Sequence, residues 1–295
     1  MIGMLGNGFI VLVNCIDLVK RQKLSSADCI LTGLAISRIS QLWAILCDSF
    51  LLVLWPHLYA IDKLTKIVNS FWMLSNHLAT WFATCLSVFY FFKVANFSHP
   101  CFTWLRWRIR SVVLVLLLGS LPLLFLNSES IYMFSHISTN SYKIYARNST
   151  RSPNVSETHD LHQLIVFNFI SLIPFLLSLT SLLLLVLSLM RHIRNLQLNP
   201  SSKDLSTEAH KRAMKMVMSF LFLFIIHVSS VLLTGWVFVK LQGRLAKLVV
   251  VLTSTVFPSS HSFILILGTS KLRQNAIGLL WYLNCRLKRV KSLAS

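Results

Sequence analysis

Acidic residues are scarce in this sequence. Nine Asp and Glu stand against 28 Lys and Arg, which gives a formal net charge of +19. A surplus of this kind is found in nucleic-acid-binding proteins, whose basic residues gather on one soluble face. Here the basic residues lie in short gaps between long apolar runs. The charge therefore predicts helix orientation in a bilayer and no nucleic-acid partner.

Charge of either sign is also rare. Only 13% of the residues are charged and 55% are hydrophobic, whereas soluble domains carry about 25% charged residues. The apolar runs suit spanning helices of about 20 residues and are too long for barrel strands of about 10. We predict an all-α membrane protein, a seven-transmembrane-helix bundle that forms one domain over 1–295. The expected helices cover about 2–16, 29–55, 67–92, 109–127, 164–190, 214–239 and 245–268.

Most of the Lys and Arg residues fall in the first, third and fifth connections and in the tail 269–295. By the positive-inside rule the N-terminus lies outside and the tail is cytoplasmic. The fourth connection, 128–163, then lies outside, and its two sequons predict glycosylation at Asn148 and Asn154. A third sequon at Asn96 falls on the cytoplasmic side and should stay unmodified. The Pro residues 122, 174 and 258 predict bends in their helices.

Cysteine is sparse as well, and none of the six lies in a predicted outer loop. We expect no structural disulfide. No Cys-x-x-Cys pair, Cys/His cluster or nucleophile–base–acid set is present, so the sequence predicts no metal, no cofactor and no enzyme.

One ionisable residue stands out within a predicted span. Arg38 lies in "LTGLAISRIS", and a polar group in the bilayer is costly unless it is paired. We expect Asn7 and Ser262 to be its partners, in a polar clamp that joins helices. A seven-helix transporter or channel, the alternative from another class, would show more ionisable groups at this depth.

The third predicted helix carries polar and aromatic residues at both ends. Trp72 and Asn76 are four residues apart and share a face, and His77 is adjacent. Tyr90 lies about 27 Å further along the axis, at the inner surface. A helix with this layout suits the transmission of a signal across the membrane.

Six sequence blocks resemble those of the bitter taste receptors, the taste receptor type 2 family of G-protein-coupled receptors. They occur in the family's order along nearly the whole chain. The blocks are "GNGFIVLVNC", "LAISR", "FYFFKVANFSHP", "SLMRH", "HKRAMKMVMSFL" and "HSFILILGTSKLRQ".

This resemblance implies a plasma-membrane, multi-pass receptor for small bitter molecules that activates a gustducin-like heterotrimeric G protein. Homo- or hetero-oligomers are compatible with it. The resemblance implies ligand contacts at Trp72, Asn76, His77, His227 and Val251. It implies G-protein coupling at Phe89, Tyr90, Lys93, His192, His210 and Lys215.

Two departures from the family pattern bear on function. The first helix is expected to be truncated, since only about 15 apolar residues precede Asp17, and family members have a further stretch before "GN". Thr269 stands where the family has asparagine. A type 1 vomeronasal-like pheromone receptor and a non-signalling truncated copy are the alternatives, although the blocks on helices 3, 6 and 7 argue against the pheromone receptor.

Overall fold

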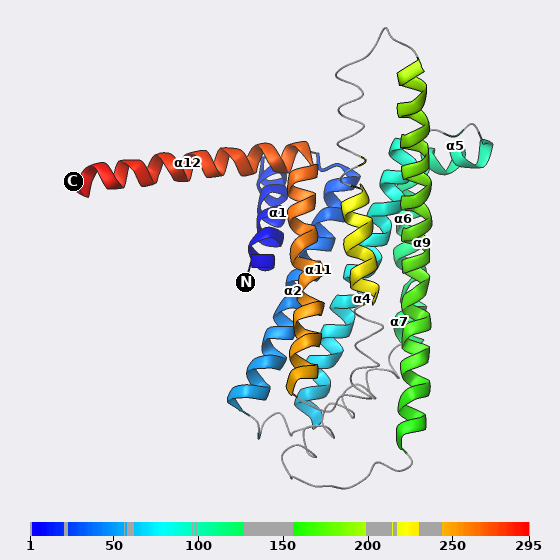
Figure 1. Cartoon of the computed structure of the whole chain (residues 1–295), viewed down its shortest axis with the longest axis vertical. Coiled ribbons are helices and arrows are strands. Elements are labelled where there is room, and N and C mark those ends of the chain that lie inside the picture. Colours follow the sequence, from blue (N-terminus) through cyan, green and yellow to red (C-terminus); the bar gives the residue numbers. More distant parts are fainter. Residues whose placement is uncertain are drawn as a thin grey trace.

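A computed structural model gives the fold of the chain (Figure 1). The structure describes residues 2–20, 23–55, 57, 62–95, 97, 99–126, 156–198, 214, 217–229 and 244–294. Throughout these residues the regular secondary structure is helical. The elements are α1 (Ile2–Val19), α2 (Ser26–Leu54), α4 (Asp62–Val94), α5 (Pro100–Trp107), α6 (Ile109–Gly119), α7 (Leu121–Leu126), α9 (Ser156–Leu198), the helical segment Val217–Ser229, α11 (Arg244–Gly268) and α12 (Ser270–Ala294).

The bundle is apolar outside and polar inside. Within the described part of the chain, five helices are long and apolar enough to cross a membrane, and two shorter apolar segments lie in Val217–Ser229 and Thr255–Gly268. Trp43 and Leu187 are exposed, whereas Asn7, Arg38 and His261 are buried. This is the reverse of a soluble protein and matches the predicted membrane bundle.

Helix α4 lies at the centre of the bundle and packs against α2, α6 and α9. One core cluster, with Leu34 and Phe89 among its members, joins α1, α2, α4 and α11. A second, around Phe224 and Phe257, joins α9, the segment Val217–Ser229 and α11. A third holds α5 against α4 and α6. α4 therefore contacts more of the described bundle than its neighbours do and connects the first and third core clusters.

The first two helices differ from their predicted bounds for identifiable reasons. α1 continues to Val19 because the carboxylate of Asp17 pairs with Lys271 instead of ending the helix. α2 begins at Ser26 because Ser25 caps it and exchanges hydrogen bonds with Asp28 in a capping box. The prediction for α2 followed the first apolar residue and missed the cap.

The fourth predicted span, 109–127, is two helices in the structure. α6 ends at Gly119 and α7 begins at Leu121, next to Pro122. Pro122 has no amide hydrogen to continue the helix, so the interruption falls where the proline predicted a bend.

Helix α9 corrects the bounds of the outer loop. It runs for 43 residues, from Ser156 to Leu198, past Pro174. The first residues of α9 were expected in the loop 128–163, whereas 128–155 lie outside the described residues. Of the predicted span 214–239, the structure describes 214 and 217–229, all helical.

The predicted tail is also a helix. α12 begins two residues after the end of α11 and leaves the bundle sideways, across the direction of the spanning helices (Figure 1). Apolar spacing alone did not predict this element, because the tail mixes basic and apolar residues.

Candidate functional site

The predicted ligand residues of α4 point in different directions. The amide oxygen of Asn76 accepts a hydrogen bond from Nε2 of Gln41 on α2, at 3.0 Å. His77 is buried, and its Nε2 lies 3.3 Å from the hydroxyl of Ser120 at the α6–α7 junction. Trp72 is half-buried, one turn before Asn76. Asn76 and His77 therefore contact different neighbours of α4.

His227 lies on the segment Val217–Ser229 and contacts α11. Its ring stacks on Phe257, with centroids 4.4 Å apart and an interplanar angle of 17°. Phe257 in turn stacks on His261 at 5.5 Å. Phe224 packs against Phe257 at 5.8 Å, and Phe220 against His261 at 4.4 Å. A continuous series of rings, the ring stack His227–Phe257–His261, thus runs along the interface of the two helices.

The structure corrects the expected partners of Arg38. Nδ2 of Asn7 donates to the carbonyl oxygens of Gly3 at 2.8 Å and Pro258 at 3.3 Å. The hydroxyl of Ser262 donates to the same Pro258 carbonyl at 2.7 Å. Asn7 and Ser262 therefore share a backbone acceptor and do not bond to Arg38. The prediction chose partners by side-chain type, whereas the nearer acceptor is a main-chain carbonyl.

Arg38 instead lies against the ring stack. Its guanidinium carbon is 5.1 Å from the centroid of Phe257, in a cation–π contact. Within the part of the chain that the structure describes, its two terminal nitrogens have no hydrogen-bond partner, and the same holds for both ring nitrogens of His261 and for Nδ1 of His227. These buried polar atoms surround Phe257 and make the middle of the bundle sensitive to small displacements, because burial without hydrogen bonds is costly.

A small cavity separates the ring stack from the inner end of α4. It holds about 30 Å³ and is lined by His261, Phe220, Tyr90 and Ser87 among others. The side chains of Tyr90 on α4 and Thr269, directly after α11, are close enough to interact. Tyr90 is thus the residue of α4 that faces the end of α11 at the inner side of this cavity.

The other inner residues of α4 belong to the same region. Phe89 is buried in the first core cluster and packs edge-on against Tyr90, with centroids 6.0 Å apart. Nζ of Lys93 lies 5.5 Å above the ring of Phe89, and the Lys93 side chain is exposed. Buried Phe89 is thus a core residue, whereas Lys93 is accessible to a partner.

The remaining predicted residues are described only in part. His192 is within α9 and Val251 within α11, but their side chains lie outside the description. His210, Lys215, Asn148 and Asn154 lie outside the described residues altogether.

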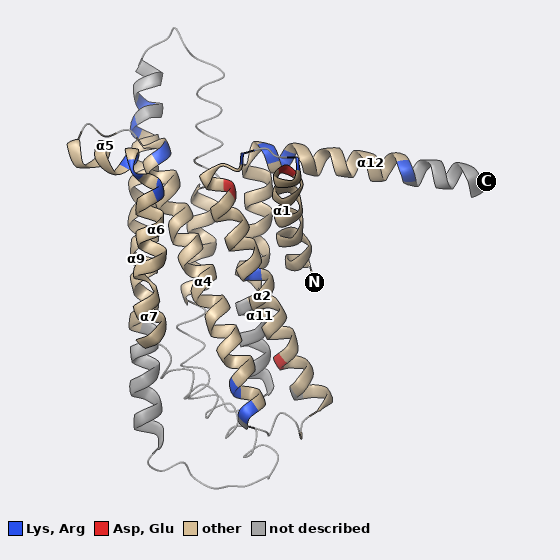
Figure 2. Ribbon diagram, turned by 180° about the vertical axis from the view of Figure 1, so that it is seen from behind, with Lys and Arg blue, Asp and Glu red and all other residues tan. Residues whose placement is uncertain are grey.

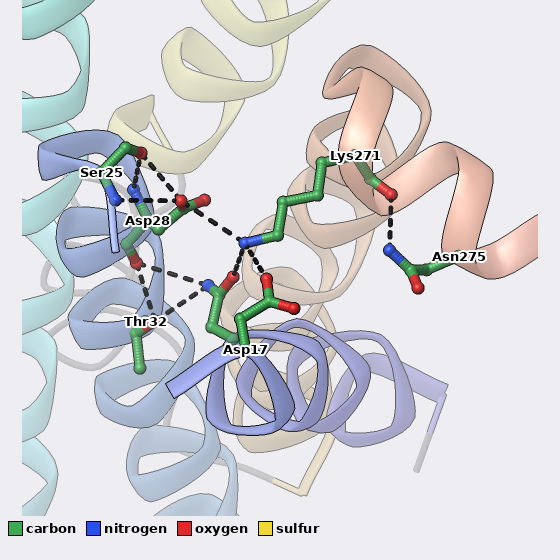
Figure 3. Close-up of polar contacts among 7 residues, drawn as sticks. Asp17, Ser25, Asp28, Thr32, Lys271 and Asn275 are labelled. Carbon is green, nitrogen blue, oxygen red and sulfur yellow. Dashed lines mark hydrogen bonds and ion pairs between the residues drawn. The ribbon is translucent and has the colours of Figure 1, made fainter. Parts of the chain in front are cut away.

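A cluster around Lys271, which sequence reasoning missed, joins α12 to α1 and α2 (Figure 3). Nζ of Lys271 lies 2.6 Å from the carboxylate of Asp17 and 3.4 Å from that of Asp28. It also donates to the side-chain oxygen of Asn14 at 2.9 Å. We call these contacts the Lys271 clamp. The scarcity of acids could have indicated it, since Asp17 and Asp28 are two of only nine.

The clamp changes the titration of its lysine. Partial burial lowers the pKa of Lys271, but the hydrogen bond to Asp17 and the charges of Asp28 and Asp17 outweigh that effect. The net pKa is raised above the usual lysine value. The lysine therefore stays charged at neutral pH and holds the start of α12 against the inner ends of α1 and α2.

A second interhelical contact fixes α9 to α4. The hydroxyl of Ser178 donates to Thr84 at 2.9 Å, and Thr84 donates to the carbonyl of Pro174 at 3.2 Å. Both side chains are fully buried. This pair lies about two turns from Asn76 and two from Tyr90, so it ties the middle of α4 to α9.

Comparison with known proteins places this geometry in context. The family model described as "Taste receptor protein (TAS2R)" matches residues 1–284. "Taste receptor type 2 member 42" of Pan troglodytes is 54% identical over 286 residues, which covers 96% of this chain and 90% of that protein. The Homo sapiens protein of the same name is 52% identical with the same coverage, over 284 residues. "Taste receptor type 2 member 7" of Papio hamadryas is 46% identical over 290 residues, or 97% of this chain and 92% of the relative.

Proposed function

Because the chain belongs to the TAS2R family of taste receptors, we propose that it binds small bitter molecules in the outer half of the bundle and activates a gustducin-like heterotrimeric G protein at the inner face. The family is one of multi-pass chemosensory receptors for bitter compounds and not of enzymes. The observation that supports the proposed mechanism best is the ring stack His227–Phe257–His261, which leads from the ligand side toward the cavity beside Tyr90.

On the ligand side, Asn76 and His227 are the polar residues best suited to recognise a ligand. The Asn76 amide can both donate and accept, and its bond to Gln41 can be exchanged for one to a ligand. Nδ1 of buried His227 has no hydrogen-bond partner among the described residues, so a ligand that bonds to it would satisfy a buried polar atom. Trp72 and Val251 would supply apolar surface around these groups.

His77 has a different part in this proposal. Its contact with Ser120 and its tilted packing on Trp81 at 6.1 Å hold α4 against the α6–α7 junction. We assign His77 the role of positioning α4. A change at His77 would then affect ligand binding through the position of the helix and not through direct contact.

Transmission follows from the ring stack. Displacing His227 toward a ligand changes its overlap with Phe257, and Phe257 also bears the contacts of Arg38 and His261. A shift at this residue therefore alters the balance between two packings of the segment Val217–Ser229 on α11. Ligand binding selects the packing it fits better, which is a population shift.

At the inner face, loss of the contact between Tyr90 and Thr269 would separate α4 from the end of α11. Exposed Lys93, together with the basic residues His192, His210 and Lys215, would then contact the G protein, with Phe89 as the rigid support of Lys93. Glycans on Asn148 and Asn154 would show that the connection 128–163 lies outside the cell.

The test is calcium release in cells that co-express the full chain and a promiscuous G protein, against a broad panel of bitter compounds. Asn76→Ala should raise the half-maximal concentration of an active compound about tenfold, equivalent to about 1.4 kcal/mol. Replacing His227 by Phe keeps the ring but removes its nitrogens. If His227 bonds to the ligand, His227→Phe should lose sensitivity, whereas preserved sensitivity would reduce its role to stacking.

Controls separate binding from expression. Trp43→Ala removes a tryptophan on α2 that faces outward, so its response should equal that of the unchanged chain at equal surface levels. His77→Ala and Ser120→Ala remove the two sides of one contact and should lower responses to all compounds alike. A chain that reaches the surface but answers no compound, or an Asn76→Ala variant with unchanged sensitivity to every active compound, would contradict the proposal.

A further inference from the structure

One cation in the middle of the bundle has no acid close to it. Arg38 on α2 is only 1% exposed. The acids of the same helix, Asp28 and Asp48, are each ten residues away, or about 15 Å along the axis. The sequence has no Asp or Glu from 63 to 128 or from 209 to 295, so the facing parts of α4 and α11 supply none. Figure 2 shows a basic position at mid-height of the bundle and acidic positions nearer its two ends.

The buried polar atoms around this cation are mostly hydrogen-bond donors. Among the described residues, both terminal nitrogens of Arg38 and both ring nitrogens of His261 have no hydrogen-bond partner, and His261 is fully buried. A guanidinium has only donors, and a neutral imidazole carries one N–H in either tautomer. The carbonyl of Pro258 already accepts from Asn7 and Ser262. Buried donors without an acceptor favour a ligand that accepts hydrogen bonds.

Arg38 and His261 lie against the same aromatic ring. The guanidinium carbon of Arg38 is 5.1 Å from the centroid of Phe257. The ring of His261, one turn further along α11, is nearly parallel to that of Phe257 at 5.5 Å. The charge of Arg38 acts electrostatically on the His261 ring. Donors from α2 and α11 are therefore gathered around one residue of the ring stack.

The charge of Arg38 decides what kind of acceptor suits this place. A water molecule could accept hydrogen bonds from these donors, but it would leave the positive charge unbalanced in the interior of a membrane protein. An anion accepts the same bonds and also neutralises the guanidinium. The chemistry therefore favours a negatively charged ligand over water.

The space beside His261 limits the size of that ligand. His261 lines the cavity of about 30 Å³ that also contacts Ser87 and Tyr90, and this volume is about that of one water molecule in the liquid. Phe220 packs against the other surroundings of the imidazole, with ring centroids 4.4 Å apart. The cavity gives the His261 side chain room to yield to a monatomic ion, whereas a phosphate or an organic acid would be too large.

We propose that the middle of the bundle binds a chloride ion between Arg38 and His261. The terminal nitrogens of Arg38 and one N–H of His261 donate to the ion, which thereby joins α2 to α11. The ion acts as the buried counter-charge that the sequence does not provide. The proposal rests neither on the bitter ligand nor on the G protein.

The test is thermal unfolding of the purified full chain in detergent while sodium gluconate is replaced mole for mole by sodium chloride. This exchange keeps the ionic strength constant, and gluconate is too large for the site. The Tm of the unchanged chain should rise along a saturable curve, by roughly 2–6 °C when chloride exceeds its dissociation constant about tenfold. Bromide should act like chloride, whereas sulfate at equal ionic strength should not.

Variants assign the effect to the two side chains. Arg38→Met should lose the chloride dependence, whereas Arg38→Lys keeps the charge and should need about tenfold more chloride for half of the effect. His261→Phe keeps the ring but removes its N–H, and it should also need about tenfold more chloride. Arg273→Met removes a cation outside the site, so it should respond to chloride like the unchanged chain.

Two results would overturn the proposal. An equal rise in Tm in the unchanged chain and in the Arg38→Met variant would mean that chloride acts at the protein surface. An unchanged chain whose Tm does not respond to chloride would mean that the Arg38 nitrogens find their acceptor within the chain. If Arg38→Met does not fold, an unaltered chloride response of both Arg38→Lys and His261→Phe would have the same weight against the site.

Discussion

Replacing Lys271 by methionine tests whether one side chain holds α12 to the inner ends of α1 and α2. The lysine is 30% exposed, and its partners Asp17 and Asp28 are 19% and 14% exposed at the side chain. Ion pairs at this degree of exposure are worth about 0.5–1 kcal/mol each after screening. Losing both, with the bond to Asn14, should lower the free energy of unfolding by about 1–2 kcal/mol.

The assay is thermal unfolding of the purified full chain in detergent. A loss of that size corresponds to a fall in Tm of roughly 2–6 °C. Arg273→Met is the matched control, because it removes a cation from the same turn of α12 without touching the clamp, and its Tm should stay within about 1 °C of the unchanged chain.

A double-mutant cycle then isolates the pair. Asp17→Asn should cost stability in the unchanged chain but almost none in the Lys271→Met variant, a coupling of about 0.5–1 kcal/mol. Additive losses would refute the reasoning, because they would mean that the 2.6 Å contact between the two side chains contributes nothing to the fold.

The pH dependence of the clamp has a defined sign. The pKa of Lys271 is raised in the folded chain, so its contribution is fully present below the unfolded value of about 10.4 and is lost as pH rises through the folded value. The Tm difference between the Lys271→Met variant and the unchanged chain should therefore be constant from neutral pH to about pH 9, and shrink only above about pH 10.4.

Three further substitutions probe the bundle, each read as Tm of the full chain. A Cβ on Gly3 would lie 2.9 Å from the backbone Cα of Ser259, whereas one on Gly8 meets nothing within 4 Å. Gly3→Ala should therefore lower the free energy of unfolding by about 1–3 kcal/mol, and Gly8→Ala should not lower it. Equal effects of the two substitutions would contradict this packing. In chloride-free buffer Arg38→Met should not lower Tm, because a buried guanidinium whose two terminal nitrogens find no hydrogen bond among the described residues costs more than its cation–π contact returns. A clear fall in Tm would mean that these nitrogens have a partner. Thr84→Val should lower the free energy of unfolding by about 1–2 kcal/mol, because it removes the acceptor of the hydrogen bond from Ser178. An unchanged Tm would mean that this bond does not stabilise the fold.

The spans could be predicted from composition, and the termini of the helices could not. Hydropathy reflects only how favourably an apolar segment enters lipid, so it predicts the apolar centre of each helix and not its ends. The end of α1 depends on a pair between Asp17 and Lys271, which are far apart in sequence. The start of α2 depends on a cap at Ser25, a local signal that the apolar pattern hides. α12 lies at the surface, where a one-dimensional count of apolar residues finds no span.

The candidate site was predicted by residue identity but not by direction. Asn76 and His77 are neighbours in sequence, and the helix turns them about 100° apart, toward Gln41 on one side and Ser120 on the other. His261 is the first residue of the block "HSFILILGTSKLRQ" and is not among the predicted ligand residues, although it lines the cavity beside Tyr90. Its aromatic neighbours on two helices give it this place, and their sequence spacing cannot show which helices touch.

The contacts within the bundle point to a rule about its prolines. Most hydroxyls in α4 bond back to a carbonyl of their own helix, as Thr80 does to Asn76 at 2.8 Å. Two side-chain bonds between helices end instead on proline carbonyls: Thr84 bonds to Pro174 on α9, and Asn7 bonds to Pro258 on α11. A proline bends its helix and tilts nearby carbonyls outward, which exposes a lone pair to the neighbour. In lipid, where no water competes for that acceptor, a proline predicts where a polar side chain of the next helix will bond. This reasoning predicts that Asn7 bonds to the carbonyl of Pro258 and Thr84 to that of Pro174. Arg38 then has no such carbonyl and makes its cation–π contact with Phe257.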